Sequence, residues 1–345
     1  MSTVTEIALS PAMHGINQAK YILNRLFRDF DGGIRIHLWD GSEILLGRDH
    51  PTFSLTFRSA KAFQELVLSR DPLCLAESYF QGRIDIDGDY YHALKLRHYL
   101  TSLKLSLIEK SAIAGNALRI KPDKIASTGS DTPKWVKTLA QRLGASSSKK
   151  LNHDAISFHY DVSNDFYALW LDEKMIYSCA YYEDEGQRLE QAQSNKLDYI
   201  CRKLRLKPSG LFLNHGITSD KGGWKKSVVT EFLNRYVFPD AQLETVSTVQ
   251  QVMEDAGFEI HDVESLRQHY ALTLREWVSR LELRHEEALQ HVPESVYRIW
   301  RLYMAACALQ FEEGDAGIYQ ILASRRAAFS RPVPLTRRDL YDQPR

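Results

Sequence analysis

Residues 206–217, LKPSGLFLNHGI, decide the fold of the second half of this chain. Pro208 and Gly210 end a helical pattern, and the apolar run after them predicts a strand over 211–217. Outward from this strand, helices are predicted at 164–171, 187–204, 248–256, 266–289 and 294–311, and further strands at 258–263 and 318–323. Helices and strands that alternate with short loops predict an α/β fold with a mainly parallel sheet over residues 151–330.

The first part of the chain has the pattern of a smaller domain. Short alternating runs at 34–39, 43–46, 53–57 and 84–88 are divided by Asp40-Gly41 and Pro51, which predicts strands of an antiparallel meander. Helical spacing follows at 59–69 and 73–80. Residues 1–20 carry little pattern and are interpreted as a loose lead-in. We therefore expect an α+β domain over 20–110.

Residues 101–150 are basic, with ten Lys and Arg side chains against Glu109, Asp123 and Asp131. Apolar residues between these charges predict amphipathic helices in a linker over 111–150. Such a segment can lie on an anionic membrane surface. A solvated linker is an equally good interpretation, and the serines at 146–148 suit a flexible joint before residue 151.

The composition excludes several classes of protein. Among 345 residues, 44 Lys and Arg balance 44 Asp and Glu, so the net charge predicts no nucleic-acid partner. The four cysteines have no metal-ligand spacing, so no metal is expected, and their scatter suits reduced thiols in the cytoplasm. The N-terminal residues lack the pattern of a signal peptide, and no apolar run is long enough to cross a bilayer. We expect a cytoplasmic protein that associates peripherally with the inner membrane surface.

Several longer motifs resemble one family. They are HYDVSNDFY (159–167), MIYSCAYY (175–182), LEQAQSNK (189–196), GLFLNHGI (210–217), AGFEIHDVE (256–264) and GIYQILASR (317–325). In this order they resemble the catalytic domain of cyclopropane-fatty-acyl-phospholipid synthases and mycolic acid cyclopropane synthases, which are class I methyltransferases dependent on S-adenosylmethionine. LAESY (75–79) and IDIDGD (84–89) resemble the N-terminal lipid-associated domain of that family.

The resemblance implies methylene transfer from S-adenosylmethionine to cis-unsaturated acyl chains of membrane phospholipids. The sequence does not decide the oligomeric state, and a homodimer is one alternative. Cys307 matches the cysteine assigned to the active site, although its alanine neighbours on a helix equally suit a buried structural thiol. Cys179, His215, Tyr270 and Ile217 match positions that hold a bicarbonate base, and thiol, imidazole and phenol groups are donors that suit an anion. Tyr177, Ser178 and Tyr160 match contacts to the cofactor.

Such chemistry needs a dry site with aromatic faces for a cationic intermediate. Seven aromatic residues between 160 and 182 suit this demand, although each is also compatible with an ordinary core position.

One part of the family pattern is missing. A class I methyltransferase holds its cofactor at a glycine-rich turn after the first strand, and this sequence contains no Gly-x-Gly. Members of the family have one Leu-Lys-Pro-Gly-like segment before the first strand and another before the strand that resembles 211–217. Here residues 206–210 match both segments at once. This points to an in-frame loss between Gly210 and Leu211 of about 90 residues, at roughly 30 per βα repeat. The fold class expected is therefore an incomplete Rossmann-like domain. The alternative function is a catalytically inactive lipid-surface-binding remnant or damaged gene product.

Overall fold

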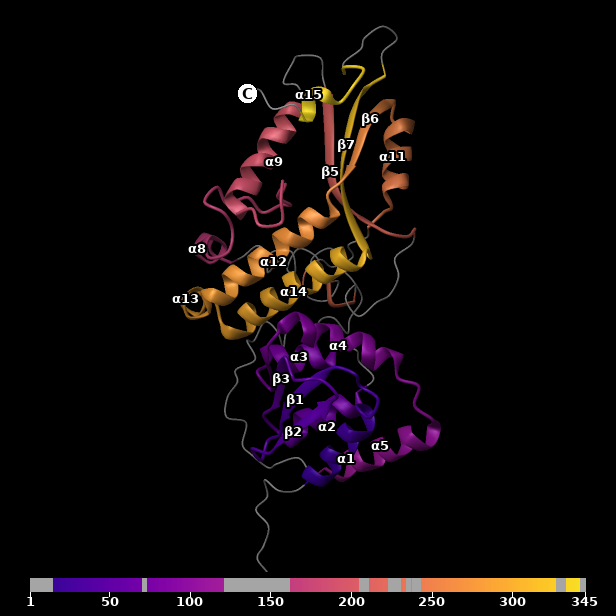
Figure 1. Ribbon diagram of the computed structural model, residues 1–345, viewed down its shortest axis with the longest axis vertical. Coiled ribbons are helices and arrows are strands. Elements are labelled where there is room, and N and C mark those ends of the chain that lie inside the picture. Colours follow the sequence, from indigo (N-terminus) through magenta and orange to yellow (C-terminus); the bar gives the residue numbers. More distant parts are fainter. Residues whose placement is uncertain are drawn as a thin grey trace, which may run out of the picture. The chain divides into compact units, whose positions relative to one another are not determined.

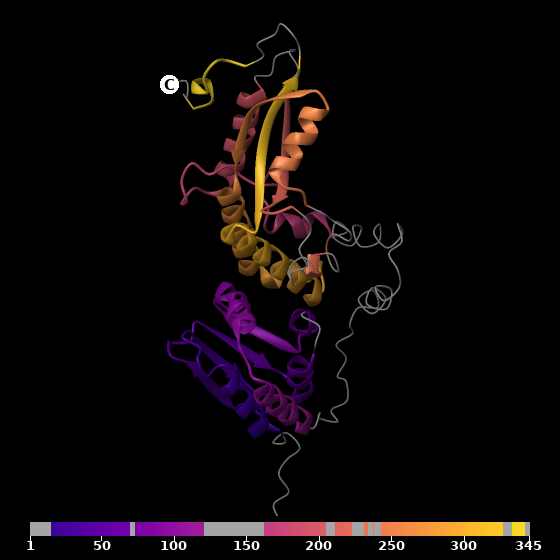
Figure 2. The same cartoon turned by 90° about the vertical axis from the view of Figure 1, so that its right-hand side faces the viewer.

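The computed structural model describes residues 15–69, 73–120, 162–204, 211–222, 231–233, 237, 243–326 and 333–341. The chain divides into two compact units. Met1–Ser146 and Glu294–Arg298 form the first, and Ser147–Pro293 and Ile299–Arg345 form the second. Figures 1 and 2 show each unit with its own sheet and helices. Of the helices described, none has the length and apolar character that a bilayer crossing requires.

The first unit contains a four-stranded sheet in the order β2-β1-β3-β4. Its strands are β1 (Gly33–His37), β2 (Glu43–Gly47), β3 (Phe53–Phe57) and β4 (Ile84–Gly88), close to the four predicted runs. Alternation decides their faces: β3 buries Phe53, Leu55 and Phe57 and leaves the residues between them half-buried.

The prediction of an antiparallel meander is wrong. β1 pairs antiparallel with β2, and β3 pairs antiparallel with β4, but β1 and β3 run parallel. Because β2 carries the chain back along the outer edge of β1, the next strand enters on the other side of β1 in the same direction. The alternation of apolar and polar residues shows which face of a sheet each residue lies on, but it does not show whether two strands run parallel or antiparallel.

Five helices accompany this sheet: α1 (Ile16–Leu26), α2 (Ala60–Leu68), α3 (Cys74–Phe80), α4 (Tyr90–Ser102) and α5 (Leu107–Arg119). The predictions of α2 and α3 are confirmed, whereas α1 begins inside the segment interpreted as a lead-in, and that interpretation is wrong for residues 16–20. α4 was not predicted either, although Asp89 caps it by accepting a hydrogen bond from the backbone N–H of His92 at 2.9 Å. Ser106 and Glu109 form a capping box that starts α5.

The second unit contains a three-stranded sheet in the order β5-β7-β6. β5 (Leu211–Ser219) and β6 (Phe258–Ser265) both pair antiparallel with the central strand β7 (Ala316–Arg325). The three strands are confirmed, but the prediction of a mainly parallel sheet is wrong for the described residues. β5 and β6 run in the same direction, and β7 separates them. Antiparallel strands at one side of an otherwise parallel sheet are common in doubly wound folds, and here they make up the described sheet.

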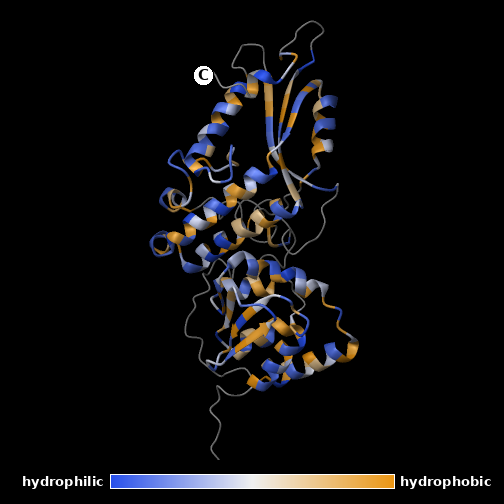
Figure 3. Cartoon of the chain, viewed as in Figure 1, coloured by the Kyte–Doolittle hydropathy of each residue, from blue (hydrophilic) through white to orange (hydrophobic). Residues whose placement is uncertain are grey.

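Helices cover the second sheet and extend from one end of it (Figure 1). α9 (Leu189–Leu204) lies beside β5, and α11 (Val246–Asp255) lies beside β6. In Figure 3 hydrophobic and hydrophilic residues alternate along α9, as expected for a helix with one buried face. The remaining helices are α8 (Asn164–Ala168), α12 (Arg267–Leu283), α13 (His285–His291), α14 (Glu294–Glu313) and α15 (Arg338–Tyr341).

The helix predicted over 266–289 is two helices, α12 and α13, which meet at Arg284. That residue has a non-helical backbone conformation, with φ −112° and ψ 31°. Its guanidinium Nη1 donates to the carbonyl oxygens of Ala168 and Leu169, at 3.2 and 3.0 Å. The break is therefore stabilised by a contact with the end of α8, which lies more than a hundred residues earlier in the chain.

A buried cation joins α9 to the sheet. Lys203 is 0% exposed, and its ammonium donates to the carboxylate of Glu264 on β6 and to Oε1 of Gln320 on β7, the latter at 2.9 Å. Asp262 lies 3.7 Å away, and the ring of Tyr199 lies 4.7 Å below the ammonium. A single lysine thus connects three elements that the sequence places far apart.

Candidate functional site

The predicted site residues gather around a cluster of aromatic rings in the second unit. Trp170, 0% exposed, lies at its centre. The rings of Tyr167, Tyr177, Trp277 and Trp300 have their centroids 5.3–5.4 Å from the ring of Trp170. These side chains come from α8 and the segment after it, α12 and α14. Their edge-to-face and tilted arrangement is the favoured one for aromatic pairs, and it excludes water from the space between them.

The segment 172–182 is shaped by hydrogen bonds from neighbouring residues. Asp172, 3% exposed, accepts from the backbone N–H groups of Lys174 and Ile176, at 3.2 and 2.8 Å. Met175 takes a left-handed conformation, with φ 55°. This turn delivers Tyr177 to the ring of Trp170.

The next residues of that segment are fastened to α9 and α12. Nε2 of Gln193 donates to the carbonyl oxygen of Ser178 at 2.9 Å. The backbone N–H of Ala180 donates to Oγ1 of Thr273 at 3.0 Å, and that of Tyr182 donates to Nδ1 of His269 at 2.9 Å. The motif that carries Tyr177, Ser178 and Cys179 is therefore held rigidly between two helices.

Tyr177, Tyr270 and Cys307 meet around the hydroxyl of Tyr303. Burial raises the pKa of Tyr303 well above its usual value, and Tyr177, Cys307 and Tyr270 all lie close enough to add to this effect. Burial raises the pKa of the Cys307 thiol to about 12, while a hydrogen bond with Tyr303 opposes the shift. This shift is opposite to the lowered pKa that activates a nucleophilic thiol.

A second group of predicted residues surrounds Lys196. This lysine is 3% exposed, and its Nζ donates to Oγ of Ser178 at 2.8 Å. Burial lowers the pKa of Lys196 to about 8, while Cys179 and Asp172 oppose the shift. Burial, with help from Lys196 and Lys203, lowers the pKa of His215 to about 4. Ser178, Cys179 and His215 therefore share one buried cation.

The thiol of Cys179 faces backbone carbonyl groups. It is 0% exposed, and its Sγ donates to the carbonyl oxygens of Ala180 and Leu266, at 3.2 and 3.8 Å. Burial raises the pKa of Cys179 far above its usual range. This thiol is protonated at neutral pH, with its hydrogen-bonding capacity turned toward the backbone.

Some of the buried polar atoms without a partner in the described part of the chain belong to residues that surround the segment 176–179. Four of the thirteen such atoms belong to residues around this segment: Nε2 of His215, Oε1 of Gln193 and the indole Nε1 atoms of Trp170 and Trp277. Buried donors and acceptors are usually satisfied, so a group of unsatisfied ones suits a site for a polar ligand.

Two predicted residues stay outside these groups. Ile217 lies on β5 opposite Ile318 and is 42% exposed. Tyr160 falls outside the described residues. Within those residues, no group of three or more His, Cys, Asp or Glu side chains is arranged to hold a metal ion.

Lys196 and Tyr303 were missed by sequence reasoning. The buried positions of α9 include Leu189, Ala192, Lys196, Tyr199 and Lys203, spaced three or four residues apart. Such spacing defines one face of a helix, and a lysine within that stripe is a signal that could have identified Lys196.

We expect the stability of the second unit to decline as the pH falls from 6.5 to 4, partly because of His215. The unfolded histidine binds a proton near pH 6.5, whereas the folded one does so at about 4. Between these values the unfolded state binds more protons, which lowers the free energy of unfolding by up to about 1.4 kcal/mol per pH unit. Thermal unfolding at several pH values measures this slope.

His215→Gln should flatten this pH dependence of the melting temperature. His291→Gln, at the exposed end of α13, is the matched control and should leave it unchanged. An equal slope in the wild type and His215→Gln would contradict the low pKa of His215.

Comparisons with known proteins agree on one family. The family model described as mycolic acid cyclopropane synthetase matches residues 147–209 and 206–321. A model for a domain of unknown function matches residues 21–102. A protein of Pseudomonas putida named probable fatty acid methyltransferase is 27% identical over 409 residues, covering 89% of this chain and 96% of its own length. A protein of Mycobacterium tuberculosis with the same printed function is 24% identical over 397 residues, covering 85% and 91%.

Solved structures of the same kind are also similar to this chain. The cyclopropane synthase MmaA2 of Mycobacterium tuberculosis is 20% identical, with a TM-score of 0.44 over 50% of this chain and 97% of that one. The mycolic acid cyclopropane synthase CmaA1, complexed with SAH and CTAB, is 21% identical, with a TM-score of 0.45 over the same shares of the two chains.

Proposed function

Because the chain belongs to the mycolic acid cyclopropane synthetase family, we propose that it acts on lipids by methyl or methylene transfer from S-adenosylmethionine. The acceptor we propose is a cis-unsaturated acyl chain of a membrane phospholipid. The protein would reach this acceptor at an anionic membrane surface on the cytoplasmic side, as a peripheral protein.

The aromatic cluster carries this proposal. Tyr177 lies among the rings of Tyr167, Trp170, Trp277 and Trp300, with centroids 5.3–6.3 Å from its own. Apolar walls suit an acyl chain, and aromatic faces stabilise a cation that forms where the double bond reacts. The same walls exclude the water that would otherwise capture such a cation.

The residues present fit one end of S-adenosylmethionine and not the other. When bound, this cofactor supplies an electrophilic methyl group. Its amino-acid end carries an ammonium and a carboxylate, and Ser178, the cation of Lys196 and the unsatisfied Oε1 of Gln193 suit these groups. The nucleoside end would need the glycine-rich turn, and the sequence contains no Gly-x-Gly.

A bicarbonate ion is the proton acceptor that we propose for this site. The imidazole of His215 stays neutral because burial lowers its pKa to about 4, and its Nε2 has no partner among the described residues. Together with the cation of Lys196, it would hold a small anion. Cys179 and Tyr270 lie in the adjoining groups, and the thiol of Cys179 is already turned to carbonyl oxygens. Bicarbonate there would supply a base inside a dry site.

A second candidate function, lipid binding without methyl transfer, is favoured by the missing turn. The two segments that match the family model overlap at residues 206–209, which supports an in-frame loss at this point. The alignment with the first of the two relatives spans 409 positions but takes in 89% of 345 residues, so about 100 positions have no counterpart here. Such a protein would keep the first unit and the aromatic cluster, and with them its binding to lipid, and would lose its affinity for S-adenosylmethionine.

Calorimetric titration of S-adenosylmethionine into the folded chain, followed by incubation with vesicles of dioleoyl phosphatidylglycerol, tests the two candidates. Methyl transfer predicts that S-adenosylmethionine binds with a dissociation constant of about 1 μM, which corresponds to a binding free energy of about 8 kcal/mol. It also predicts that the labelled methyl group appears in the lipid. Lys196→Met should abolish both the binding and the labelling, whereas the exposed control Lys221→Met should keep both. A folded chain that gives no heat and no labelled lipid, but sediments with the vesicles, supports the second candidate instead.

A further inference from the structure

Strand β5 forms one edge of the second sheet and β6 forms the other, with β7 between them (Figure 1). On the outer side of β5 the described residues provide a single backbone contact, in which the N–H of Ser219 donates to the carbonyl oxygen of Glu244 at 3.0 Å. Within the described part of the chain, residues 211–218 have no backbone hydrogen bond on that side. An unpaired strand edge is a template for another strand.

The two edges differ in the features that prevent pairing with other chains. β6 carries Glu259, Asp262 and Glu264, and its register shifts between Ile260 and Asp262. Charges and bulges of this kind keep an edge strand from pairing. Residues 211–218 of β5, LFLNHGIT, contain no Lys, Arg, Asp, Glu or Pro, and the ladder with β7 has no register shift. The edge at β5 is therefore open to pairing, whereas the edge at β6 is protected.

The direction of each backbone group along β5 follows from the contact at Ser219. In an antiparallel ladder a residue directs its N–H and its C=O to the same side, and consecutive residues alternate between the two sides. Since Ser219 directs its N–H away from β7, every second residue before it does the same. These outward-directed residues are Leu211, Leu213, His215 and Ile217. Each of them offers both a donor and an acceptor at the outer edge.

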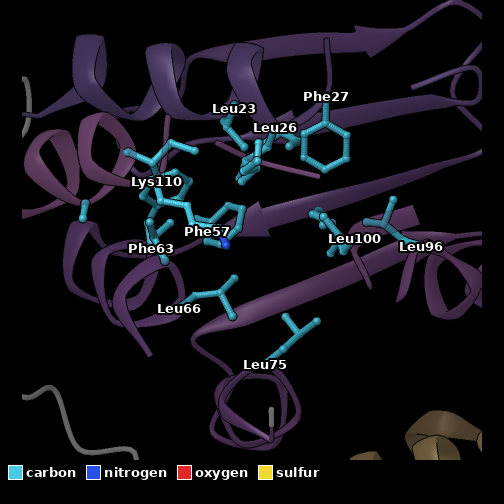
Figure 4. A pocket seen from close by; sticks show the side chains of 16 residues that line it. Leu23, Leu26, Phe27, Phe57, Phe63, Leu66, Leu75, Leu96, Leu100 and Lys110 are labelled. Atoms are coloured by element: carbon cyan, nitrogen blue, oxygen red, sulfur yellow. The ribbon is translucent and has the colours of Figure 1, made fainter. Parts of the chain in front are cut away.

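β5 also exposes apolar side chains that a second strand would cover. In the first unit, β3 turns its apolar side chains inward, and Phe57 lines a cavity with Leu23 and Leu66 (Figure 4). In contrast, Phe212 and Ile217 of β5 are 43% and 42% exposed. Successive side chains of a strand point to opposite faces, so these two residues leave apolar surface open on both faces of the sheet at this edge.

We propose that the outer edge of β5 pairs antiparallel with β5 of a second copy of this chain, about a two-fold axis at Asn214. In this register Leu211 lies opposite the partner's Ile217, and Leu213 lies opposite the partner's His215. Each of the four pairs of outward-directed residues makes two backbone hydrogen bonds, which gives about eight in all. The two three-stranded sheets become one continuous sheet.

The same register places the largest exposed side chain opposite the smallest residue. Phe212 lies opposite the partner's Gly216, and an aromatic ring that covers a glycine of the neighbouring strand stabilises a sheet. The ring of Phe212 packs on Phe258, with centroids 5.3 Å apart, and 43% of the residue stays exposed for this contact. A side chain at Gly216 would meet only Oδ1 of Asn214, at 3.4 Å, so there is space above this glycine.

Charge and position favour a second copy as the partner. A two-fold contact brings each residue near its own counterpart, so a charged strand would repel itself, and residues 211–218 have no charge. The contact with Glu244 occupies the edge at Ser219 and confines the pairing to residues 211–217, whose midpoint is Asn214. A shift by two residues in either direction would remove Phe212 from Gly216. The pairing requires neither S-adenosylmethionine nor lipid, so it goes beyond the proposed function.

Sedimentation equilibrium of the full chain and of two charge variants tests the proposal. We expect the wild type to have twice the mass of one chain. Asn214→Lys places two positive charges opposite each other at the axis, and Asn214→Asp places two negative ones there. Each variant alone should dissociate at least about tenfold more readily than the wild type, whereas an equimolar mixture of the two should associate again. Gln251→Lys, at an exposed position on α11, is the matched control and should leave the association unchanged.

Hydrogen exchange identifies the surface that associates. In the peptide that spans residues 211–217, the outward-directed amides of the wild type should exchange at least about tenfold more slowly than those of Asn214→Lys. The peptide that spans residues 258–264 on β6 should exchange equally in both proteins, because its edge takes no part in the contact.

Phe212→Ala, at an exposed position, replaces the two charge variants if circular dichroism shows that they do not fold. It should weaken the association roughly tenfold, since two contacts between Phe212 and Gly216 are lost in each dimer. A wild type with the mass of one chain would overturn the proposal, and slow amides in that monomer would mean that the chain's own residues cover β5. A dimer that persists in every folded variant would lie on another surface and overturn it as well. None of these measurements involves S-adenosylmethionine, so failure of this contact and failure of the proposed reaction are distinguishable.

Discussion

Lys203→Met should lower the free energy of unfolding of the second unit by about 3–5 kcal/mol. The substitution keeps most of the side-chain volume but removes the cation that, among the described residues, Glu264 and Gln320 share. The carboxylate of Glu264 and the nearby Asp262 would then remain in a poorly hydrated position without this counter-charge. Urea unfolding followed by near-ultraviolet circular dichroism, which reports on the aromatic cluster, measures the loss.

Two further variants make the result specific to the buried charge. Lys221→Met removes an exposed lysine paired with Asp220 at 3.5 Å and should change stability by less than about 0.5 kcal/mol. Adding Glu264→Gln to Lys203→Met should restore part of the lost stability, because the uncompensated charge is then gone. A loss below about 1 kcal/mol in Lys203→Met would mean that water reaches this lysine.

Trp170→Ala should lower the free energy of unfolding by about 3–5 kcal/mol, the range for removing a fully buried Trp or Phe side chain. Its ring contacts four others, so the deletion leaves a cavity that the neighbours cannot fill without losing their own arrangement. The near-ultraviolet signal of the folded protein should fall as well, since Tyr177, Trp277 and Trp300 lose a common neighbour.

Trp170→Phe separates the volume of the ring from its polar atom. The indole N–H of Trp170 is buried without a partner among the described residues, so replacing it by Phe also removes an unsatisfied donor. We expect a clearly smaller loss than for Trp170→Ala. Phe212→Ala, at a position 43% exposed on β5, should cost less than either. Equal losses in Trp170→Ala and Phe212→Ala would contradict a central position for Trp170.

Most helices and strands could be predicted from the sequence, whereas their directions and junctions could not. The alternation in Phe53–Phe57 identifies β3 and its buried face, but the parallel direction of β3 beside β1 depends on where the chain re-enters the sheet. Similarly, the apolar run around Ile318 identifies β7, while its central place between β5 and β6 follows from pairing with distant strands. The break at Arg284 depends on a contact with α8, which no local pattern contains.

The aromatic and thiol residues of the candidate site could be predicted from the sequence, whereas its buried charged residues were missed. Tyr177, Ser178 and Cys179 stand in one recognisable motif, and the structure places the first beside the rings and the other two beside Lys196. Lysines usually lie at the surface, so their residue type alone does not point to Lys196 and Lys203, although both share a helical face with Leu189 and Ala192. Their ammonium groups are buried because Ser178, Glu264 and Gln320 supply acceptors there.

The central position of β7 determines when the second unit can fold during synthesis. Its partners β5 and β6 are completed well before it, and His215 pairs with Gln320, which the ribosome adds roughly a hundred residues later. Until β7 emerges, neither ladder can form, and both earlier strands expose their backbone groups. The sheet of the first unit, in contrast, is complete at residue 88. The sheet of the first unit is therefore expected to form early from mostly local contacts, while the second sheet waits for long-range pairing with its strand edges exposed during that interval.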